Sequence, residues 1–395
     1  MVNRMAARVW SALVIVALAG ALAAPGAVGR SVQTTDGDLQ AMLGLVPATF
    51  PHLDDPELAT ISYANIAAQL EAVDVTAPGR MDDDAFSEWF AATLGLPVPS
   101  HAAQYLQSWR EDYGFDLPQA DQTLQISLAP FDLSLFRGRF DEQEIVRTLR
   151  ELGYKPVSND WPILAIRDDY EQDISAQTAY KFAAMNYATI LDDGTLAFAS
   201  AQATLESVLD VVAGDAPSLA ERSDIAELLP NVPDGLASAL LVDGVMLTGG
   251  VPEELLELDP EATPDIEAIA TEMAEGSDMP PVVTAMLGTT VGGPLQLDDE
   301  TAPLSSDVPA ARAVIVVVMQ SPDAAKTAAP VIEERLATAA SSATDQPYAE
   351  LFPERSVEVV PETPVVRIDL TLGEGTQRNI LMQMLFNRDL GFLAW

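Results

Sequence analysis

The side chains that most often carry out catalysis are scarce in this chain of 395 residues. It holds two histidines, His52 and His101, and no cysteine. A chain without cysteine has no thiol nucleophile, disulfide or thiolate metal site. His101 follows Ser100, a predicted helix cap, so we interpret it as a surface residue. Serine-hydrolase, zinc-protease and nucleotide-binding motifs are missing too, and we predict no catalytic residue and no cofactor.

Carboxylates are the remaining candidates for chemistry. An adjacent pair such as Asp168 and Asp169 could supply the acid and base of a glycosidase. The chain has 60 acidic residues, however, so neighbouring pairs arise by chance and we assign no catalytic role to any one of them. Carboxylate oxygens also bind calcium. The candidate metal ligands are Asp298, Asp299 and Glu300, although their spacing is not that of an EF-hand loop.

The net charge of −40 bears on the choice of partner. No lysine or arginine lies between Arg222 and Arg312, a stretch rich in acidic residues. Such a surface repels phosphate backbones, so nucleic acid is excluded as a partner. The acidic stretch could capture a divalent cation or a basic partner, or it could simply keep the protein soluble. We favour solubility and expect its carboxylates to be dispersed.

The N-terminus has the order of a secretory signal. Arg4 and Arg8 precede an apolar run, and small residues follow up to Gly29. We therefore predict an extracytoplasmic protein: secreted, periplasmic or in the cell envelope. Cleavage after residue 23 or 29 is favoured. The alternative is an uncleaved anchor, because the uncharged run from Val9 is long enough to span a membrane. That segment is the only predicted contact with a membrane.

The spacing of apolar residues predicts a mixed α+β fold. Residues 123–128 and 133–140 have strand patterns, and Asp141 is placed to cap a helix that ends at Gly153. This helix should lie on a sheet through Ile145, Val146, Leu149 and Leu152. Residues 58–73 should begin as a strand and finish as a helix. The aromatic residues of 86–115 have the spacing of a helical core rather than of a ligand platform.

The later elements follow a similar order. Asp193-Gly194 predicts a hairpin, helices are expected over 205–212 and 218–229, and residues 236–246 are predicted to form a strand. Residues 313–319 form an apolar run typical of a central strand, and Ser321-Pro322 begins a helix. Two strands and a last helix complete this half. The repeated order, 133–213 and 312–390, is consistent with an internal duplication.

Several short motifs in the first half resemble a family of uncharacterised bacterial extracytoplasmic proteins. The residues are Tyr113-Gly114-Phe115-Asp116, the segment from Phe136 to Asp141, and Leu152-Gly153-Tyr154. The resemblance implies a strand that leads into a capped helix, and it implies no activity. Many such proteins are anchored through a lipid on a cysteine. This chain has no cysteine, so that anchor is not implied here.

These observations predict an α+β protein with two lobes, each an antiparallel sheet covered by helices. The expected divisions are 1–29 (signal or anchor), 30–122 (helical segment), 123–248 (first lobe), 249–310 (acidic Gly- and Pro-rich connector) and 311–395 (second lobe). We expect a non-enzymatic binding or structural module. The alternatives are a carboxylate-dependent enzyme acting on glycans and a low-affinity calcium-binding envelope protein.

Overall fold

The fold was analysed in a computed structural model that describes most of the chain beyond the N-terminal segment. The described residues are 38–49, 60–72, 76, 89, 109–128, 131–158, 161–173, 183–247, 278–290, 312–373, 376 and 380–394. The predicted signal, most of the aromatic segment 86–115 and most of the expected connector 249–310 lie outside these residues.

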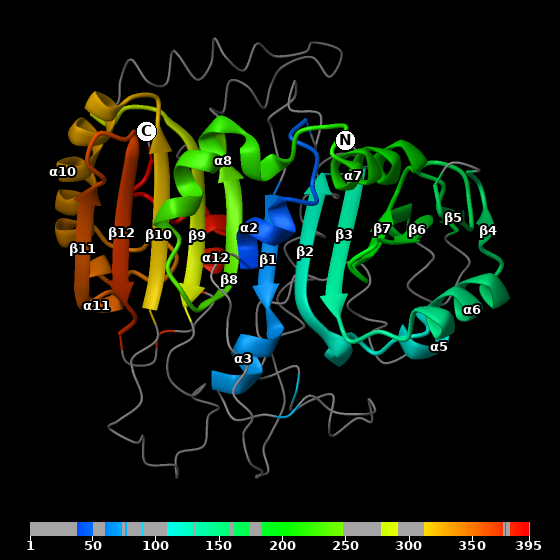
Figure 1. Ribbon diagram of the computed structural model, residues 1–395. Helices are drawn as coiled ribbons and strands as arrows, with labels where there is room; N and C mark the ends of the chain where they lie inside the picture. The colour runs from blue at the N-terminus through cyan, green and yellow to red at the C-terminus, as the bar shows by residue number, and fades with distance from the viewer. Residues whose placement is uncertain are drawn as a thin grey trace, which may run out of the picture.

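One antiparallel sheet of twelve strands organises the described residues (Figure 1). Its spatial order is β11-β12-β10-β9-β8-β1-β2-β3-β7-β6-β5-β4. The strands are β1 (Thr60–Asn65), β2 (Ala120–Leu128), β3 (Phe131–Gly138), β4 (Lys155–Pro156), β5 (Leu164–Ala165), β6 (Tyr187–Ile190), β7 (Leu196–Ala199), β8 (Leu236–Asp243), β9 (Val282–Thr290), β10 (Arg312–Met319), β11 (Glu354–Val359) and β12 (Val365–Thr371). The predicted α+β class is confirmed.

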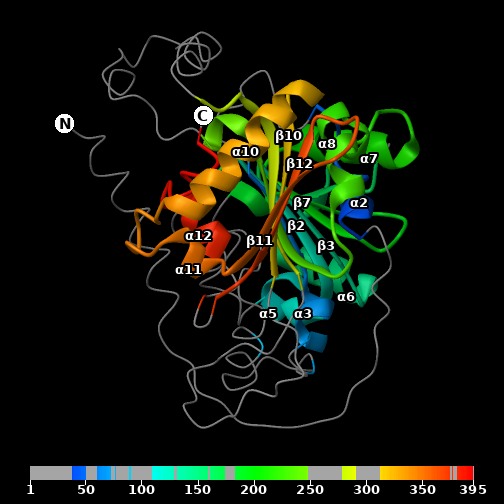
Figure 2. The same ribbon diagram turned by 90° about the vertical axis from the view of Figure 1, so that its left-hand side faces the viewer.

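Helices cover both faces of this sheet. They are α2 (Asp38–Leu43), α3 (Ile66–Ala72), α5 (Trp109–Tyr113), α6 (Glu142–Leu152), α7 (Gln202–Ala213), α8 (Ser223–Leu228), α10 (Pro322–Thr338), α11 (Tyr348–Leu351) and α12 (Ile380–Phe386). Figure 2 shows α2, α7 and α8 on one side of the sheet, the front face of Figure 1, and α10, α11 and α12 on the other, the back face.

The two predicted lobes are not confirmed as separate sheets, because β1 and β8 pair with each other. Ile61 lies opposite Leu241 and Tyr63 opposite Ala239, so the strands of both halves run on as one sheet. β1 also pairs with β2. Residues 58–73 do begin as a strand and continue as a helix, β1 and α3, as predicted. β9, within the expected connector, is a strand that the sequence did not predict.

The alternation of side chains along the strands builds three cores. Leu124, Ile126, Leu133 and Leu135 face the front with residues of α2, α7 and α8. On the back, Ile315, Val317 and Ile368 pack against α10 and α12. Phe136 and Phe198 share the back face of the first half with α5 and α6, beside the buried rings of Trp109 and Tyr113. The described aromatic residues of 86–115 are buried core residues, as their spacing predicted: Trp89, Trp109, Tyr113 and Phe115.

Helix α6 begins after its predicted N-cap residue, Asp141, and ends at its predicted C-cap residue, Gly153. The side chain of Asp141 accepts hydrogen bonds from the N–H groups of Gln143 and Glu144, and Gly153 ends the helix at a φ of 108°. Ile145 and Leu149 are buried, as predicted. Val146 is only half-buried and faces outward to a hollow at the surface.

The Asp193-Gly194 hairpin is also present. The Asp193 carboxylate accepts the N–H of Thr195 at 3.0 Å, and Gly194 takes a φ of 81°, which suits glycine. β6 and β7 flank this turn as predicted. None of the helices in the described ranges combines the length and the hydropathy that a membrane span requires.

Candidate functional site

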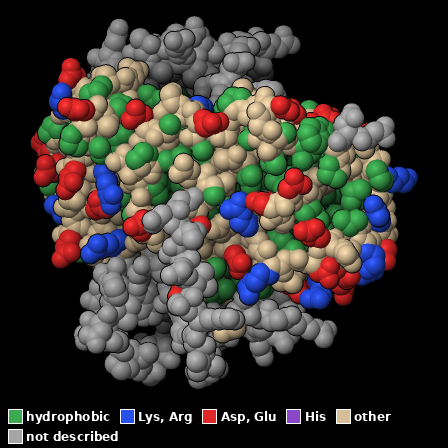
Figure 3. Space-filling model, viewed as in Figure 1, with side chains coloured by type: hydrophobic (Ala, Val, Ile, Leu, Met, Phe, Trp, Pro, Cys, Tyr) green, Lys and Arg blue, Asp and Glu red, His purple; other side chains and the backbone are tan. Residues whose placement is uncertain are grey.

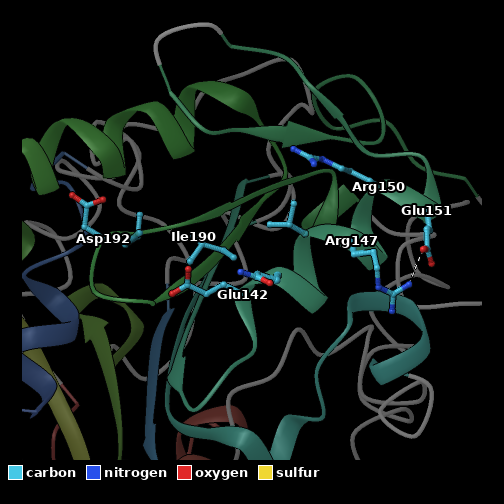
Figure 4. A pocket seen from close by; sticks show the side chains of 9 residues that line it. Glu142, Arg147, Arg150, Glu151, Ile190 and Asp192 are labelled. Atoms are coloured by element: carbon cyan, nitrogen blue, oxygen red, sulfur yellow. Dashed lines mark hydrogen bonds and ion pairs between the residues drawn. The ribbon is translucent and has the colours of Figure 1, made fainter.

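An open hollow lies between the outward side of α6 and the end of β6, with a volume of about 810 Å³ (Figure 4). Ligand pockets commonly have volumes of roughly 300–1,000 Å³. Its lining residues are Glu142, Gln143, Val146, Arg147, Arg150, Glu151, Ile190, Leu191 and Asp192. Two elements that the sequence did predict, the capped helix and the hairpin, therefore create a surface feature that it did not.

The charged residues of the hollow are ordered along the axis of α6, with acidic residues near its N-terminus and a basic residue near its C-terminus. Glu142 lies in its first turn, near Asp192 in the hairpin turn, and Arg150 lies in its last turn (Figure 4). Eight residues of helix separate Glu142 from Arg150, a rise of about 12 Å. A carboxylate in the first turn and a cation in the last turn are both favourable for the helix dipole. The hollow thus has an acidic end and a basic end.

Only part of this charge is already paired. The Arg147 guanidinium binds the carboxylates of Glu144 and Glu151, each at 2.6 Å. Arg150, in contrast, has no ion-pair partner in the part of the chain that the structure describes. The carboxylates of Glu142 and Asp192 are exposed and likewise have no partner within the described residues. One guanidinium and two carboxylates remain available to a ligand.

Cations are concentrated in this part of the chain. Figure 3 shows basic side chains beside acidic ones at the end where α6 and β4 lie, as well as in the middle of the front face and at the opposite end. Six of the 20 basic residues fall within 137–167: Arg137, Arg139, Arg147, Arg150, Lys155 and Arg167. The strongly acidic character of the chain is therefore not uniform.

The adjacent residues Asp168 and Asp169 accept hydrogen bonds that stabilise the local fold. The Asp169 carboxylate accepts the N–H of Gln202 at 3.0 Å, at the start of α7, whose N-cap residue Ala201 has no side-chain acceptor. It therefore caps α7 from a distant loop. The backbone carbonyl of Asp168 accepts from the Asn186 amide at 2.9 Å. Sequence reasoning missed this capping role because the two partners are 33 residues apart.

A second pair of carboxylates has pKa values that are shifted in opposite directions. Burial alone would raise the pKa of Asp224, but hydrogen bonds from Arg222 and Thr284 and the charge of Arg222 hold it below its usual range. Burial raises the pKa of Asp243, against the hydrogen bond from the Val245 N–H. Both lie on the front face near Thr284, which pairs with Asp243 across the sheet, and neither lines the hollow.

The candidate metal ligands Asp298, Asp299 and Glu300 lie outside the described residues, as do His52 and His101. In the described part of the acidic stretch, Asp224 pairs with Arg222 and Asp278 pairs with Arg335. No group of three or more acidic or histidine side chains is placed to hold a metal ion within the described residues.

A row of polar side chains is buried on the back face of the first half. Thr123 and Ser134 are 0% and 1% exposed, and their hydroxyl groups have no hydrogen-bond partner among the residues that the structure describes. Gln125, opposite Ser134, is 6% exposed. Buried polar groups are nearly always hydrogen-bonded, so these positions require an explanation. The alternation of 123–128 showed that these side chains share a face, but not that this face is buried.

Comparisons with protein-family models, with curated proteins and with solved structures find no match to this chain.

Proposed function

We propose that this chain is a non-enzymatic, extracytoplasmic binding protein and that the hollow beside α6 receives its ligand. The observation that carries the proposal is the separation of charges that have no partner among the described residues, with Glu142 and Asp192 at one end and Arg150 at the other. The carboxylates that line the hollow are exposed. A general acid needs a raised pKa, which usually comes from burial, so exposed carboxylates suit binding better than proton transfer.

The spacing of these charges favours an extended ligand that carries both signs. A distance of about 12 Å along α6 corresponds to roughly four residues of extended chain. A short peptide segment with a basic group at one end and a carboxylate at the other matches this spacing. Val146, Ile190 and Leu191 would contact its apolar atoms between the charges.

Titration of labelled tetrapeptides tests this binding function. A peptide with lysine at one end and glutamate at the other should bind, and Arg150→Ala should weaken binding about tenfold or more, the loss of one charge-assisted hydrogen bond. Lys326→Ala is the matched control, because it removes an exposed helical cation of α10 that is paired with Asp323. Equal affinity in wild type and Arg150→Ala would contradict the proposal.

The extracytoplasmic location rests on the N-terminal order of charged, apolar and small residues. Mass spectrometry of the exported protein should find a chain that begins after residue 23 or 29. An intact N-terminus in the membrane fraction would favour the anchor instead, and a protein found only in the cytoplasm would contradict both. The resemblance to bacterial extracytoplasmic proteins remains a prediction.

A carboxylate-dependent enzyme acting on glycans is the second candidate, and the opposite pKa shifts of Asp224 and Asp243 favour it. Paired carboxyl groups in unequal environments are the usual basis for an acid and a base in glycosidases. Hydrolysis of a panel of glycans, lost in Asp243→Asn, would support this candidate. Hydrolysis that is undetectable, or unchanged in Asp243→Asn, would exclude a role for this pair.

We propose as well that the two halves derive from an internal duplication. When α3, α5, β4 and β5 of the first half and α11 of the second are left out, the order β1-β2-β3-α6-β6-β7 corresponds to β8-β9-β10-α10-β11-β12. The strand neighbours correspond too, since β7 lies between β3 and β6 as β12 lies between β10 and β11. Superposition of the two halves should require a rotation near 180° about an axis between β1 and β8. A rotation far from that value would refute the proposal.

A further inference from the structure

We infer that four neighbouring side chains in the first half of the sheet bind a hard cation through oxygen atoms. They are Gln125 and Ser127 of β2 and Asp132 and Ser134 of β3, named here the polar block. This site is separate from the hollow beside α6, and the inference does not depend on the function proposed for that hollow.

The register of the hairpin places the four side chains together. Gln125 lies directly opposite Ser134, and Ser127 lies directly opposite Asp132. Side chains two residues apart on a strand share a face, so all four project from the back face. Opposed Cβ atoms are about 5 Å apart, and successive side chains of one face are about 7 Å apart. The polar block is thus a rectangle with an oxygen-bearing side chain at each corner.

Two members of the polar block, Ser134 and Asp132, lack a side-chain partner among the described residues. Ser134 is 1% exposed, and its hydroxyl group has no hydrogen-bond partner in this part of the chain. Among the described residues, no side chain or N–H group donates to the carboxylate of Asp132. Burial raises the pKa of Asp132 to about 6, and no cation of the described residues counters the effect. The Asp132 side chain is half-buried, and an unpaired charge that is partly removed from water is costly, so this carboxyl group needs either a proton or a positive counter-charge.

The chemistry of the four side chains favours a metal ion over an organic cation. They offer one carboxylate, two hydroxyl groups and one amide carbonyl, which are all oxygen ligands. Calcium and sodium are bound by such oxygen sets, and water molecules complete the shell when few carboxylates are present. A single carboxylate corresponds to weak binding, in the millimolar range of extracellular calcium sites.

Asp121 provides a matched control at the beginning of the same hairpin. Burial also raises the pKa of Asp121, but Arg139 lies 3.3 Å from its carboxylate and supplies the positive charge that Asp132 lacks. If burial of a strand carboxylate were sufficient for cation binding, replacing either Asp121 or Asp132 would weaken the binding. If the polar block is the site, only Asp132 and its neighbours will contribute.

Calorimetric titration with calcium, magnesium and sodium chlorides tests the inference. The full chain is first treated with a chelator, and wild type is compared with Asp132→Asn, Ser134→Ala and Asp121→Asn. Diffuse binding to the many surface carboxylates should be common to all four proteins. We expect one additional site in wild type and Asp121→Asn, a roughly three- to tenfold weaker site in Ser134→Ala, and none in Asp132→Asn. The ion that fills this site identifies calcium or sodium.

Melting curves give an independent readout. Calcium or sodium at ten times its Kd should raise the Tm of wild type and Asp121→Asn by about 2 °C more than that of Asp132→Asn. Identical titrations of wild type and Asp132→Asn would overturn the inference. So would a melting temperature that responds to pH near 6 but to no ion, because the carboxyl group would then be balanced by a proton. Ser134→Ala decides the matter if Asp132→Asn does not fold.

Discussion

Replacing Asp389 should destabilise the second half of the protein, because this carboxylate joins the C-terminal segment to the loop after α10. Asp389 is 2% exposed. Its carboxylate accepts hydrogen bonds from the Ser341 hydroxyl at 2.5 Å and from the Ser342 N–H and hydroxyl at 2.5 and 2.9 Å. The Tyr348 hydroxyl donates to the backbone carbonyl of Asp389 at 2.8 Å.

The cost of Asp389→Ala follows from what each donor can do without the carboxylate. Ser341 is buried, so its hydroxyl loses its acceptor without access to water, at a cost of about 1–3 kcal/mol. Ser342 is exposed and can bind water instead, which limits its loss to about 1 kcal/mol. Tyr348 retains the backbone carbonyl. The free energy of unfolding should therefore fall by about 2–4 kcal/mol.

Equilibrium unfolding in urea measures this loss as a shift of the midpoint. Asp345→Asn is the control: Asp345 is an exposed acid in the same loop at a φ of 57°, a conformation that asparagine tolerates. It should change the free energy of unfolding by no more than about 0.5 kcal/mol. A loss below about 1 kcal/mol in Asp389→Ala would refute the argument, since buried donors would then lack an acceptor at almost no cost.

The other predictions also use urea unfolding. In the presence of a chelator, Asp132→Asn should stabilise the protein by about 1–3 kcal/mol at pH 8 and have almost no effect at pH 3.5. Burial raises the pKa of Asp132 in the folded protein to about 6, so the wild-type carboxyl group lowers the free energy of unfolding as the pH rises from about 4 to 6. Equal effects of the substitution at both pH values would contradict this. Gly114→Ala should lower the free energy of unfolding by about 2–4 kcal/mol and Gly214→Ala by about 1 kcal/mol. Both glycines have a positive φ, but only at Gly114 would a Cβ atom press against α6. Equal losses in the two variants would refute the predicted steric clash. Thr123→Val should raise the free energy of unfolding by about 1 kcal/mol, whereas Thr189→Val, which loses a hydrogen bond to the Pro162 carbonyl, should lower it by about 1 kcal/mol. Changes of the same sign in the two variants would contradict this prediction.

Elements whose signals are local were predicted well from the sequence. The Asp141 cap and Gly153 define α6, and Asp193-Gly194 defines the hairpin, because the residues that set each conformation are neighbours in the chain. The apolar run of β10 correctly indicated a central strand covered on both faces. β9 was missed because its Gly- and Pro-rich flanks dominate the composition of that region.

The features that depend on distant pairing could not be read in the same way. No local pattern shows that β1 pairs with β8, so one sheet could not be distinguished from two. The hollow requires α6 and the end of β6 to lie side by side, and only the fold brings them together. The capping of α7 by Asp169 is likewise a contact between separate segments. Counting acidic pairs therefore drew attention to residues whose roles are structural.

The contrast between the two halves is consistent with placing both proposed binding sites in the first. At the positions of β9 and β10 that correspond to the polar block by strand order, the back face carries Ala285, Leu287, Ile315 and Val317, all buried and covered by apolar residues of α10 and α12. A sheet selected only for stability would be apolar in both halves, since buried polar groups without partners lower stability. Proteins depart from such consistency mainly at functional sites. The polar block and the hollow, the two proposed binding sites, both lie in the first half, and the apolar second half of the same sheet would then supply the stability that offsets these costly polar groups.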